Sequence, residues 1–119
     1  MKYVIESVSP EHMRTLAQAL EDPNPIHLDP QTVKDLGMGD RVINQGPANC
    51  SYIVNMLREA YPQGTITKLE FRLLGNVFGG DKAIAGGEVV SEGDTIDLIV
   101  WLDVDGRGRM VEGTATVRP

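Results

Sequence analysis

The feature that most constrains the fold of this chain is the stretch PANCSYIVNMLREAY, residues 47–61, which contains no glycine and no proline after its first residue. Its larger apolar side chains recur at helical spacing, at Ile53, Met56, Leu57 and Ala60. Small or apolar residues also occupy much of the remaining circumference. A helix that is apolar nearly all round is a buried one. The stretch therefore predicts a central helix on which the rest of the chain packs.

The sequence that follows this helix is rich in strand signals. Apolar and polar residues alternate most clearly in residues 67–73 and 96–102. Glycine-containing turn signals separate the extended stretches, which cover residues 65–78, 81–92, 94–105 and 108–117. Together with a short strand in residues 1–8, they predict an α+β domain in which an antiparallel sheet wraps over the central helix.

Two further helices are predicted in the first half of the chain. Residues 9–20 begin with Ser9, a good capping residue, and place their apolar side chains on one face. Residues 30–36 follow Asp29, which is a second capping residue. Residues 41–44 have strand-like character. These elements frame two loops that carry most of the chemical signals.

Composition limits the class of protein. The 119 residues, of 13.0 kDa, fit one domain spanning residues 1–119. A net charge of −6 and the lack of a basic run argue against nucleic-acid binding. The single cysteine, Cys50, excludes an internal disulfide and a cysteine-based zinc cluster. The first residues lack the apolar core of a signal peptide and no run is long enough to span a membrane, so we expect a cytoplasmic protein.

The loop LEDPNPIHLDP, residues 20–30, is unusually stiff. Asp22, Asn24 and Asp29 each precede a proline, which restricts them to extended backbone conformations. The loop can therefore present Asp22 and His27 in one arrangement at little entropic cost, as an acid/base pair acting on one water. A rigid turn between two helices explains the same residues, and the loop alone does not decide between the two.

A second candidate is the start of the central helix, in NQGPAN. Gly46 precedes Pro47, and free N–H groups and the positive end of the helix dipole gather there. Such a site could stabilise a carbonyl oxygen that becomes an oxyanion. A plain helix start is the competing interpretation.

Other candidates are weaker. Asp22, His27 and Asp29 lack the second ligand cluster that a metal site needs, so no metal is expected. Cys50 lies in an apolar helix, where a cysteine usually packs rather than reacts. His12, in the first turn of its helix, is expected to be solvated.

Taken together, the motifs resemble those of the MaoC-like acyl dehydratases, which include the (R)-specific enoyl-CoA hydratases. The motif D-x-N-P-[LIV]-H after a helix is matched by DPNPIH, residues 22–27. LGMGDRVINQG, residues 36–46, is similar to the family's approach to its central helix, and NVFGGD, residues 76–81, to a later turn. The resemblance covers nearly the whole chain.

This resemblance implies a hot-dog fold and a hydratase that adds water across the trans-2 double bond of an enoyl-CoA, giving a 3-hydroxyacyl-CoA of R configuration. Asp22 and His27 would be the catalytic pair, and the N–H of Gly46 would stabilise the thioester oxygen. Asn24, grouped with Gly46 as a substrate-binding position, would shape the loop. Neither a metal nor a redox cofactor is implied. Family members in lipid metabolism form homodimers or pair with another MaoC-like chain.

The chain departs from the family at three places. Leu20-Glu21 replace Ser-Gly before Asp22, Val33 replaces a small residue, and Gln45 replaces the usual histidine before the helix glycine. These departures leave the substrate and its acyl group open. A hot-dog thioesterase and a subunit that needs a partner chain are the alternatives.

Overall fold

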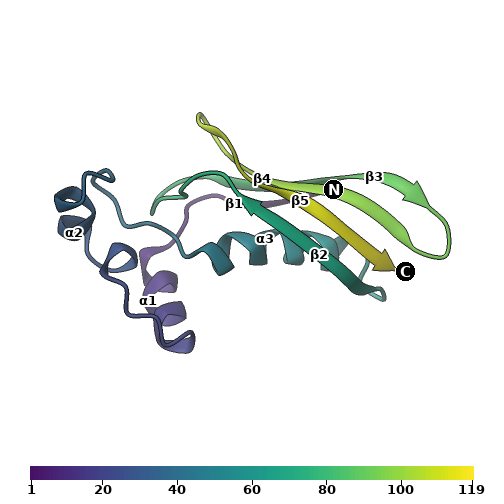
Figure 1. Ribbon diagram of the computed structural model, residues 1–119, viewed down its shortest axis with the longest axis horizontal. Coiled ribbons are helices and arrows are strands. Elements are labelled where there is room, and N and C mark those ends of the chain that lie inside the picture. The colour runs from purple at the N-terminus through teal and green to yellow at the C-terminus, as the bar shows by residue number, and fades with distance from the viewer.

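The computed structural model describes residues 1–119, folded as one antiparallel sheet with helices on one side and at one end (Figure 1). The strands pair in the order β1-β3-β4-β5-β2. They are β1 (Lys2–Ile5), β2 (Thr65–Leu73), β3 (Ala83–Glu92), β4 (Ile96–Val104) and β5 (Gly108–Arg118). The helices are α1 (Pro10–Ala19), α2 (Pro30–Asp35) and α3 (Gly46–Ala60), and a 3₁₀ turn, η1, spans Pro25–His27. The predicted α+β architecture is confirmed.

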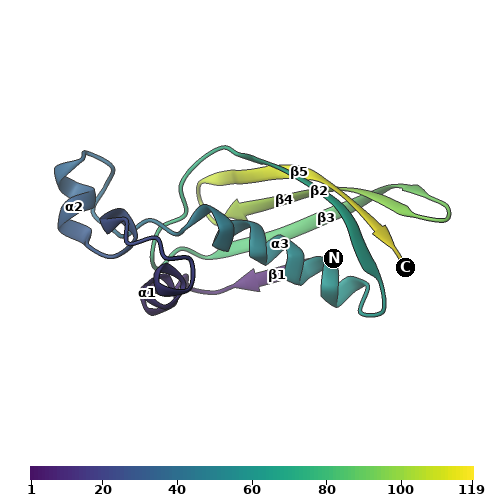
Figure 2. The ribbon, with the colours of Figure 1, turned by 60° about the horizontal axis from the view of Figure 1, so that its bottom comes forward.

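Helix α3 runs along one face of the sheet, whereas α1 and α2 project beyond one end of it (Figure 2). Ser9 and Asp29, the capping residues predicted for these two helices, do cap them. The Ser9 side chain accepts a hydrogen bond from the His12 N–H at 3.3 Å, and Asp29 Oδ1 accepts one from the Gln31 N–H at 3.0 Å. No helix is both long and apolar enough to cross a membrane.

The core forms between α3 and the sheet. Ile53, Met56 and Leu57 are all buried, and they belong to the same apolar cluster as Leu98 and Val100 of β4. Burying an aliphatic side chain of this size stabilises the folded state by about 1.5–3 kcal/mol. This packing fixes the direction of α3 and therefore the position of its first residue.

The expectation that α3 is buried nearly all round is correct for one side only. Arg58 and Glu59 are exposed, and Cys50 and Val54 are only half-buried. The reason is geometric, because one sheet covers one side of a helix. Cys50 and Val54 are therefore left only partly covered.

Residues 41–44 were expected to have strand character, and the structure corrects this. Only one bridge forms there, between Ile43 and Phe78. The Ile43 N–H instead donates to the Ile26 carbonyl oxygen at 2.8 Å, while the Asn44 N–H donates to that of Val77 at 2.7 Å. The segment is therefore shared between η1 and the loop before β3, so a continuous ladder cannot form.

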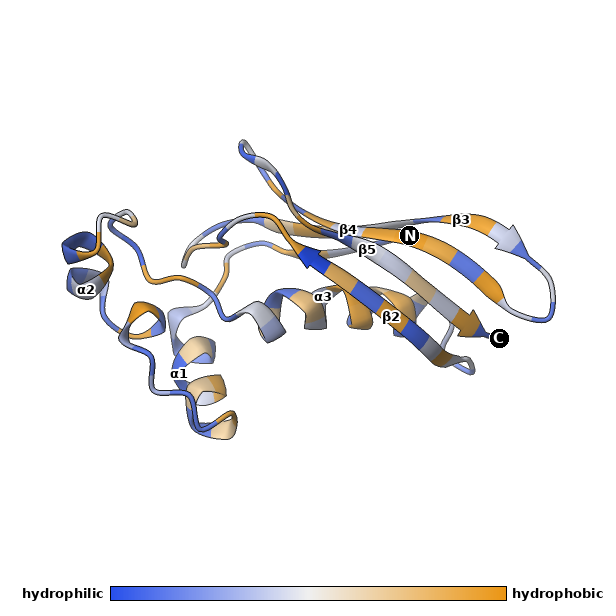
Figure 3. Cartoon of the chain, in the orientation of Figure 1, coloured by the Kyte–Doolittle hydropathy of each residue, from blue (hydrophilic) through white to orange (hydrophobic).

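Hydrophobic and hydrophilic residues alternate most clearly along β2 (Figure 3). On the face away from α3, Trp101 of β4 lies over Gly86 of β3, where its indole leaves no room for a side chain. The Arg109 guanidinium stacks on this indole, 4.7 Å from the ring centroid. Strand β2 is one edge of the sheet, and Leu73 and Leu74 at its end are 58% and 45% exposed.

Candidate active site

Asp22 is positioned by the end of helix α1. The Glu21 N–H donates to the Gln18 carbonyl oxygen at 3.2 Å, and the Asp22 N–H donates to that of Ala17 at 2.9 Å. Glu21 has a positive φ of 52°. This is the Schellman arrangement, in which the residue after the helix cap adopts a left-handed conformation. The helix end itself therefore fixes the backbone of Asp22.

The five residues after Asp22 form a compact turn that leads to His27. Asp22 Oδ1 accepts from the Asn24 N–H at 3.3 Å, and Asn24 Oδ1 accepts from the Ile26 N–H at 3.2 Å, at the start of η1. The Asn24 side chain is thus used in shaping the loop. The flanking Pro23 and Pro25 have fixed φ angles, so few alternative conformations compete with this one.

The His27 ring is buried, with 8% of the residue exposed, and its orientation is set by one strong contact. Nδ1 lies 2.6 Å from the carbonyl oxygen of Ile43. A carbonyl oxygen can only accept, so Nδ1 carries the proton in this contact. In the neutral ring, Nε2 is then left with a free lone pair.

The structure brings Asp22 and His27 together. His27 Nε2 lies 3.9 Å from Asp22 Oδ2, and the Asp22 side chain is about half exposed, at 49%. This separation is longer than a direct hydrogen bond and short enough for both atoms to contact one water or hydroxyl group. Asp29 does not join them, because its two oxygens accept from the Gln31 N–H and the Thr32 hydroxyl.

Gly46 is the first residue of α3 and follows Ile43 by three residues, which span at most roughly 11 Å. Its N–H lies in the first turn, where backbone donors have no partner within the helix. The preceding Gln45 is buried, and its Nε2 donates to the Met13 carbonyl oxygen at 2.7 Å. Gln45 therefore joins α1 to the start of α3. The sequence showed only that Gln45 replaces the family's usual histidine, and it gave no sign of this contact.

A buried polar network next to Gly46 was missed by the sequence analysis. Asn44 Nδ2 donates to Asn49 Oδ1 at 2.8 Å and to the Tyr52 hydroxyl oxygen at 3.2 Å. Burial raises the pKa of Tyr52, although the hydrogen bond from Asn44 acts to lower it. The phenol is thus neutral at pH 7 and retains its own proton to donate. Asn44 lies two residues before Gly46 and Asn49 three residues after it, and this closeness to the helix start is the one signal that could have suggested them.

This network borders a hollow of about 250 Å³ between α1 and the first turns of α3. His12 is exposed, as expected, and lies on its wall together with Ser51 and Tyr52. Asn44 and Gln45, the two residues before Gly46, are part of its lining. The hollow provides a place where a ligand could meet the start of α3.

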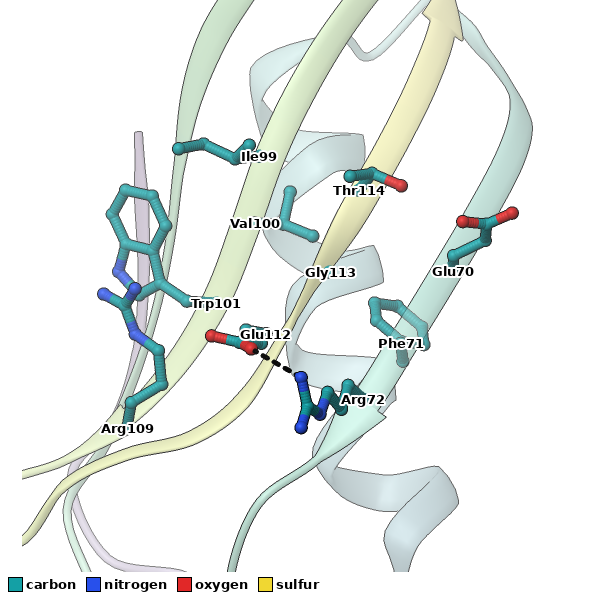
Figure 4. A pocket seen from close by; sticks show the side chains of 10 residues that line it. All are labelled: Glu70, Phe71, Arg72, Ile99, Val100, Trp101, Arg109, Glu112, Gly113 and Thr114. Carbon is teal, nitrogen blue, oxygen red and sulfur yellow. Dashed lines mark ion pairs between the residues drawn. The ribbon is translucent and has the colours of Figure 1, made fainter.

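Another hollow, of about 480 Å³, lies on the opposite face of the sheet (Figure 4). Trp101 and Arg109 lie on one side and Arg72 on the other, with Glu112 of β5 between Trp101 and Arg72. The side chains of Arg72 and Glu112 are 3.9 Å apart. None of the residues predicted to carry chemistry lines this hollow, which the sheet separates from α3.

The left-handed conformation of Glu21 generates a stability prediction. Because a side chain is disfavoured there and glycine is not, Glu21→Gly should raise the free energy of unfolding by up to about 1 kcal/mol. Urea denaturation measures this change. Glu21→Ala is the matched control, since it removes the carboxylate and keeps the backbone cost. A glycine variant no more stable than the alanine variant would contradict the assignment.

Comparisons with known proteins come from structure, since a scan against family models and a search of curated proteins each find no match. An (R)-hydratase from A. caviae involved in PHA biosynthesis superposes with a TM-score of 0.88 at 23% identity, over 99% of this chain and 93% of that one. The R-hydratase PhaJ1 from Pseudomonas aeruginosa gives 0.88 at 18% identity, over 99% and 77%. The ChsH1-ChsH2 complex from Mycobacterium tuberculosis gives 0.84 at 18% identity, over 99% and 92%.

These similarities extend over nearly the full length of this chain and include the projecting helices as well as the sheet. They agree with the arrangement of one antiparallel sheet packed on α3. The chain has the hot-dog fold of these structures.

Proposed function

We propose that this chain is a MaoC-like hydratase that adds water across the trans-2 double bond of an enoyl-CoA and also catalyses the reverse dehydration. The observation that carries the proposal is the convergence of His27 Nε2 and Asp22 Oδ2, 3.9 Å apart, from a D-x-N-P-[LIV]-H motif. The fold shared with (R)-hydratases supports it. The R configuration of the product is part of the proposal.

In the proposed mechanism, one water donates its two hydrogens to His27 Nε2 and Asp22 Oδ2. His27 removes one proton as the oxygen bonds to C3 of the enoyl thioester, and the Asp22 carboxylate stabilises the resulting imidazolium. The π electrons of the double bond move towards the thioester carbonyl and form an enolate. Nε2 then returns its proton to C2, so that the elements of one water have been added and the enzyme is regenerated.

The thioester oxygen becomes negative in the enolate intermediate, and the Gly46 N–H is the proposed donor to it. Its place in the first turn of α3 adds the positive end of the helix dipole. Because the thioester itself acidifies the α-carbon, this route calls on the chain's own donors and bases and on no metal or redox cofactor.

The thioesterase alternative is less well supported. Hot-dog thioesterases often carry a carboxylate on or near the central helix, and the only one on α3 is Glu59. Glu59 is the penultimate residue of the helix and is exposed, at the end opposite to Gly46. No observation on this helix favours hydrolysis.

A second MaoC-like chain, identical or different, is proposed to pair with this one along β2. Strand β2 is an edge strand of nine residues, with Leu73 and Leu74 exposed at its end. An unpaired strand edge is a template for another strand. A partner chain that contacts Leu73 would also lie near Gly46. The Leu73 side chain is next to this glycine, since a Cβ added to Gly46 would be 3.2 Å from Leu73 Cδ1.

The catalytic pair is tested by substitution. Asp22→Asn and His27→Ala should each lower kcat for hydration by about 10²–10⁴-fold, because each removes a proton-transfer group. The rate is followed as the loss of enoyl-thioester absorbance, with circular dichroism to confirm folding. Asp29→Asn is the matched control, since asparagine also caps α2, and it should retain activity. Near-normal hydration by both variants would refute the proposal, and release of free thiol would indicate a thioesterase.

The oxyanion donor is tested at Gly46. Gly46→Pro removes the N–H and suits the first position of a helix, so kcat should fall by about 10²–10³-fold while KM changes little. Gly46→Ala retains the N–H and adds only a methyl group beside the movable Leu73 side chain. Steady-state kinetics of both variants decide the matter: equal rates would exclude this N–H as the donor.

The partner is tested by native mass spectrometry of the purified chain. We expect the mass of two chains, or a single chain that becomes active only with a second MaoC-like protein. Leu73→Asp should weaken the pairing, because it places a charge at the contact. Val90→Asp is the control at an equally exposed residue of β3. A fully active monomer would contradict the proposal.

A further inference from the structure

Asp81 is a buried carboxylate that the proposed mechanism does not use. Only 8% of the residue is exposed. Its Oδ1 accepts from Arg41 Nη1 at 2.9 Å, and its Oδ2 accepts from the Phe78 N–H at 2.8 Å and from Arg107 Nη2. Burying a carboxylate is unfavourable unless it is paired and hydrogen-bonded, and here it is paired twice.

The two arginines connect this carboxylate to distant parts of the chain. Their guanidinium groups lie 5.2 Å (Arg41) and 4.9 Å (Arg107) from the centroid of the Phe78 ring. Arg41 also donates to the Gly79 carbonyl oxygen at 3.1 Å, and Arg107 to that of Asn76 at 3.2 Å. Residues 76–81 are thus hydrogen-bonded on one side to Arg41, in the segment before α3, and on the other to Arg107, in the turn between β4 and β5. We call Arg41, Asp81 and Arg107 the Asp81 clamp.

The clamped residues lie against the segment that orients His27. Phe78 pairs with Ile43 in the single bridge of this region. On either side, the Asn44 N–H donates to the Val77 carbonyl oxygen at 2.7 Å, and the Gly79 N–H donates to that of Val42 at 2.8 Å. Residues 42–44 therefore take their position from residues 77–79, which the clamp holds.

The last link is the Ile43 carbonyl oxygen, which lies 2.6 Å from His27 Nδ1. Asp81 is thus connected to the imidazole in three steps: its hydrogen bond with the Phe78 N–H, the two backbone hydrogen bonds that flank the Phe78–Ile43 bridge, and the contact of the Ile43 carbonyl oxygen with His27. If residues 77–79 shift, the acceptor that selects the Nδ1–H form of His27 shifts with them. A displacement of about 1 Å of a catalytic group can lower a rate by roughly 10²-fold.

We propose that Asp81 is a positioning residue for His27, acting through the Phe78 and Ile43 backbone to fix the orientation and tautomer of the imidazole. Its kinetic consequence rests on the proposed hydratase function, whereas its effect on His27 does not. A purely stabilising ion pair would change the stability of the chain and leave the imidazole of the folded protein as it is.

The test is Asp81→Asn, which retains the size of the side chain and removes the charge that binds both arginines. Side-chain ¹⁵N spectra of His27 should show one Nδ1–H tautomer in the parent protein and a mixture of tautomers in the folded variant. With an enoyl-CoA substrate, kcat should fall by about tenfold or more, with KM within about twofold. Asp103→Asn is the matched control: it breaks the 3.1 Å pair with Arg109, leaves Asp81 and both of its arginines in place, and should change neither readout.

Arg107 provides a second test if Asp81→Asn does not fold. Arg107→Gln leaves Arg41 paired with Asp81, so the chain should fold and His27 should show a smaller shift towards mixed tautomers. Arg107→Lys returns the positive charge and should restore the parent spectrum. An unchanged His27 spectrum in a folded Asp81→Asn or Arg107→Gln variant would overturn the inference.

The two proposals fail in different ways. If the parent protein hydrates no enoyl-CoA but its His27 spectrum responds to the clamp, the hydratase assignment fails and the positioning role stands. If the parent protein is an active hydratase and the clamp substitutions leave the His27 spectrum unchanged, only the positioning role fails.

Discussion

The packing of α3 on one face of the sheet is the contact on which the rest of the structure depends. Ile53, Met56 and Leu57 fill the space against β4 and leave the helix little freedom to rotate or slide. The start of the helix, at Gly46, is thereby fixed near one end of the sheet. The chain before it, from Ile43, must then cross from the projecting helices to the body of the protein.

The projecting part of the chain has no strand of its own and relies on local motifs. The Schellman end of α1 and the asparagine cap of η1 shape the loop that carries Asp22 and His27. Only a few hydrogen bonds connect this part to the segment before α3, chiefly those from His27 to Ile43 and from Gln45 to Met13. Met13 of α1 also packs in the main apolar cluster, so the relative placement of the two halves of the proposed site depends on these hydrogen bonds together with core packing.

Burial of polar groups is concentrated at this connection. The buried polar or charged side chains are His27, Asn44, Gln45, Asn49 and Asp81. Four of them lie in η1, in the segment before α3 or in its first turn. Asp81 lies in the loop before β3 and accepts a hydrogen bond from the N–H of Phe78, the residue that pairs with Ile43. Each buried polar group costs free energy unless its hydrogen bonds are made. Most of these groups have hydrogen-bond partners within the chain, whereas Gln45 Oε1 has none.

The sequence by itself determined the local features of this protein. Ser9 and Asp29 could be identified as helix starts, and Asp22 and His27 as neighbours, because caps, prolines and short loops act over a few residues. The alternation in residues 96–102 and the apolar pattern of residues 47–61 predicted the α+β fold for the same reason. Only the tertiary structure decided that α3 is covered on one side, that Ile43 orients His27 and that Asp81 holds the loop beside it. Those contacts join residues that are far apart in the chain, through backbone carbonyls and paired charges that no local pattern marks.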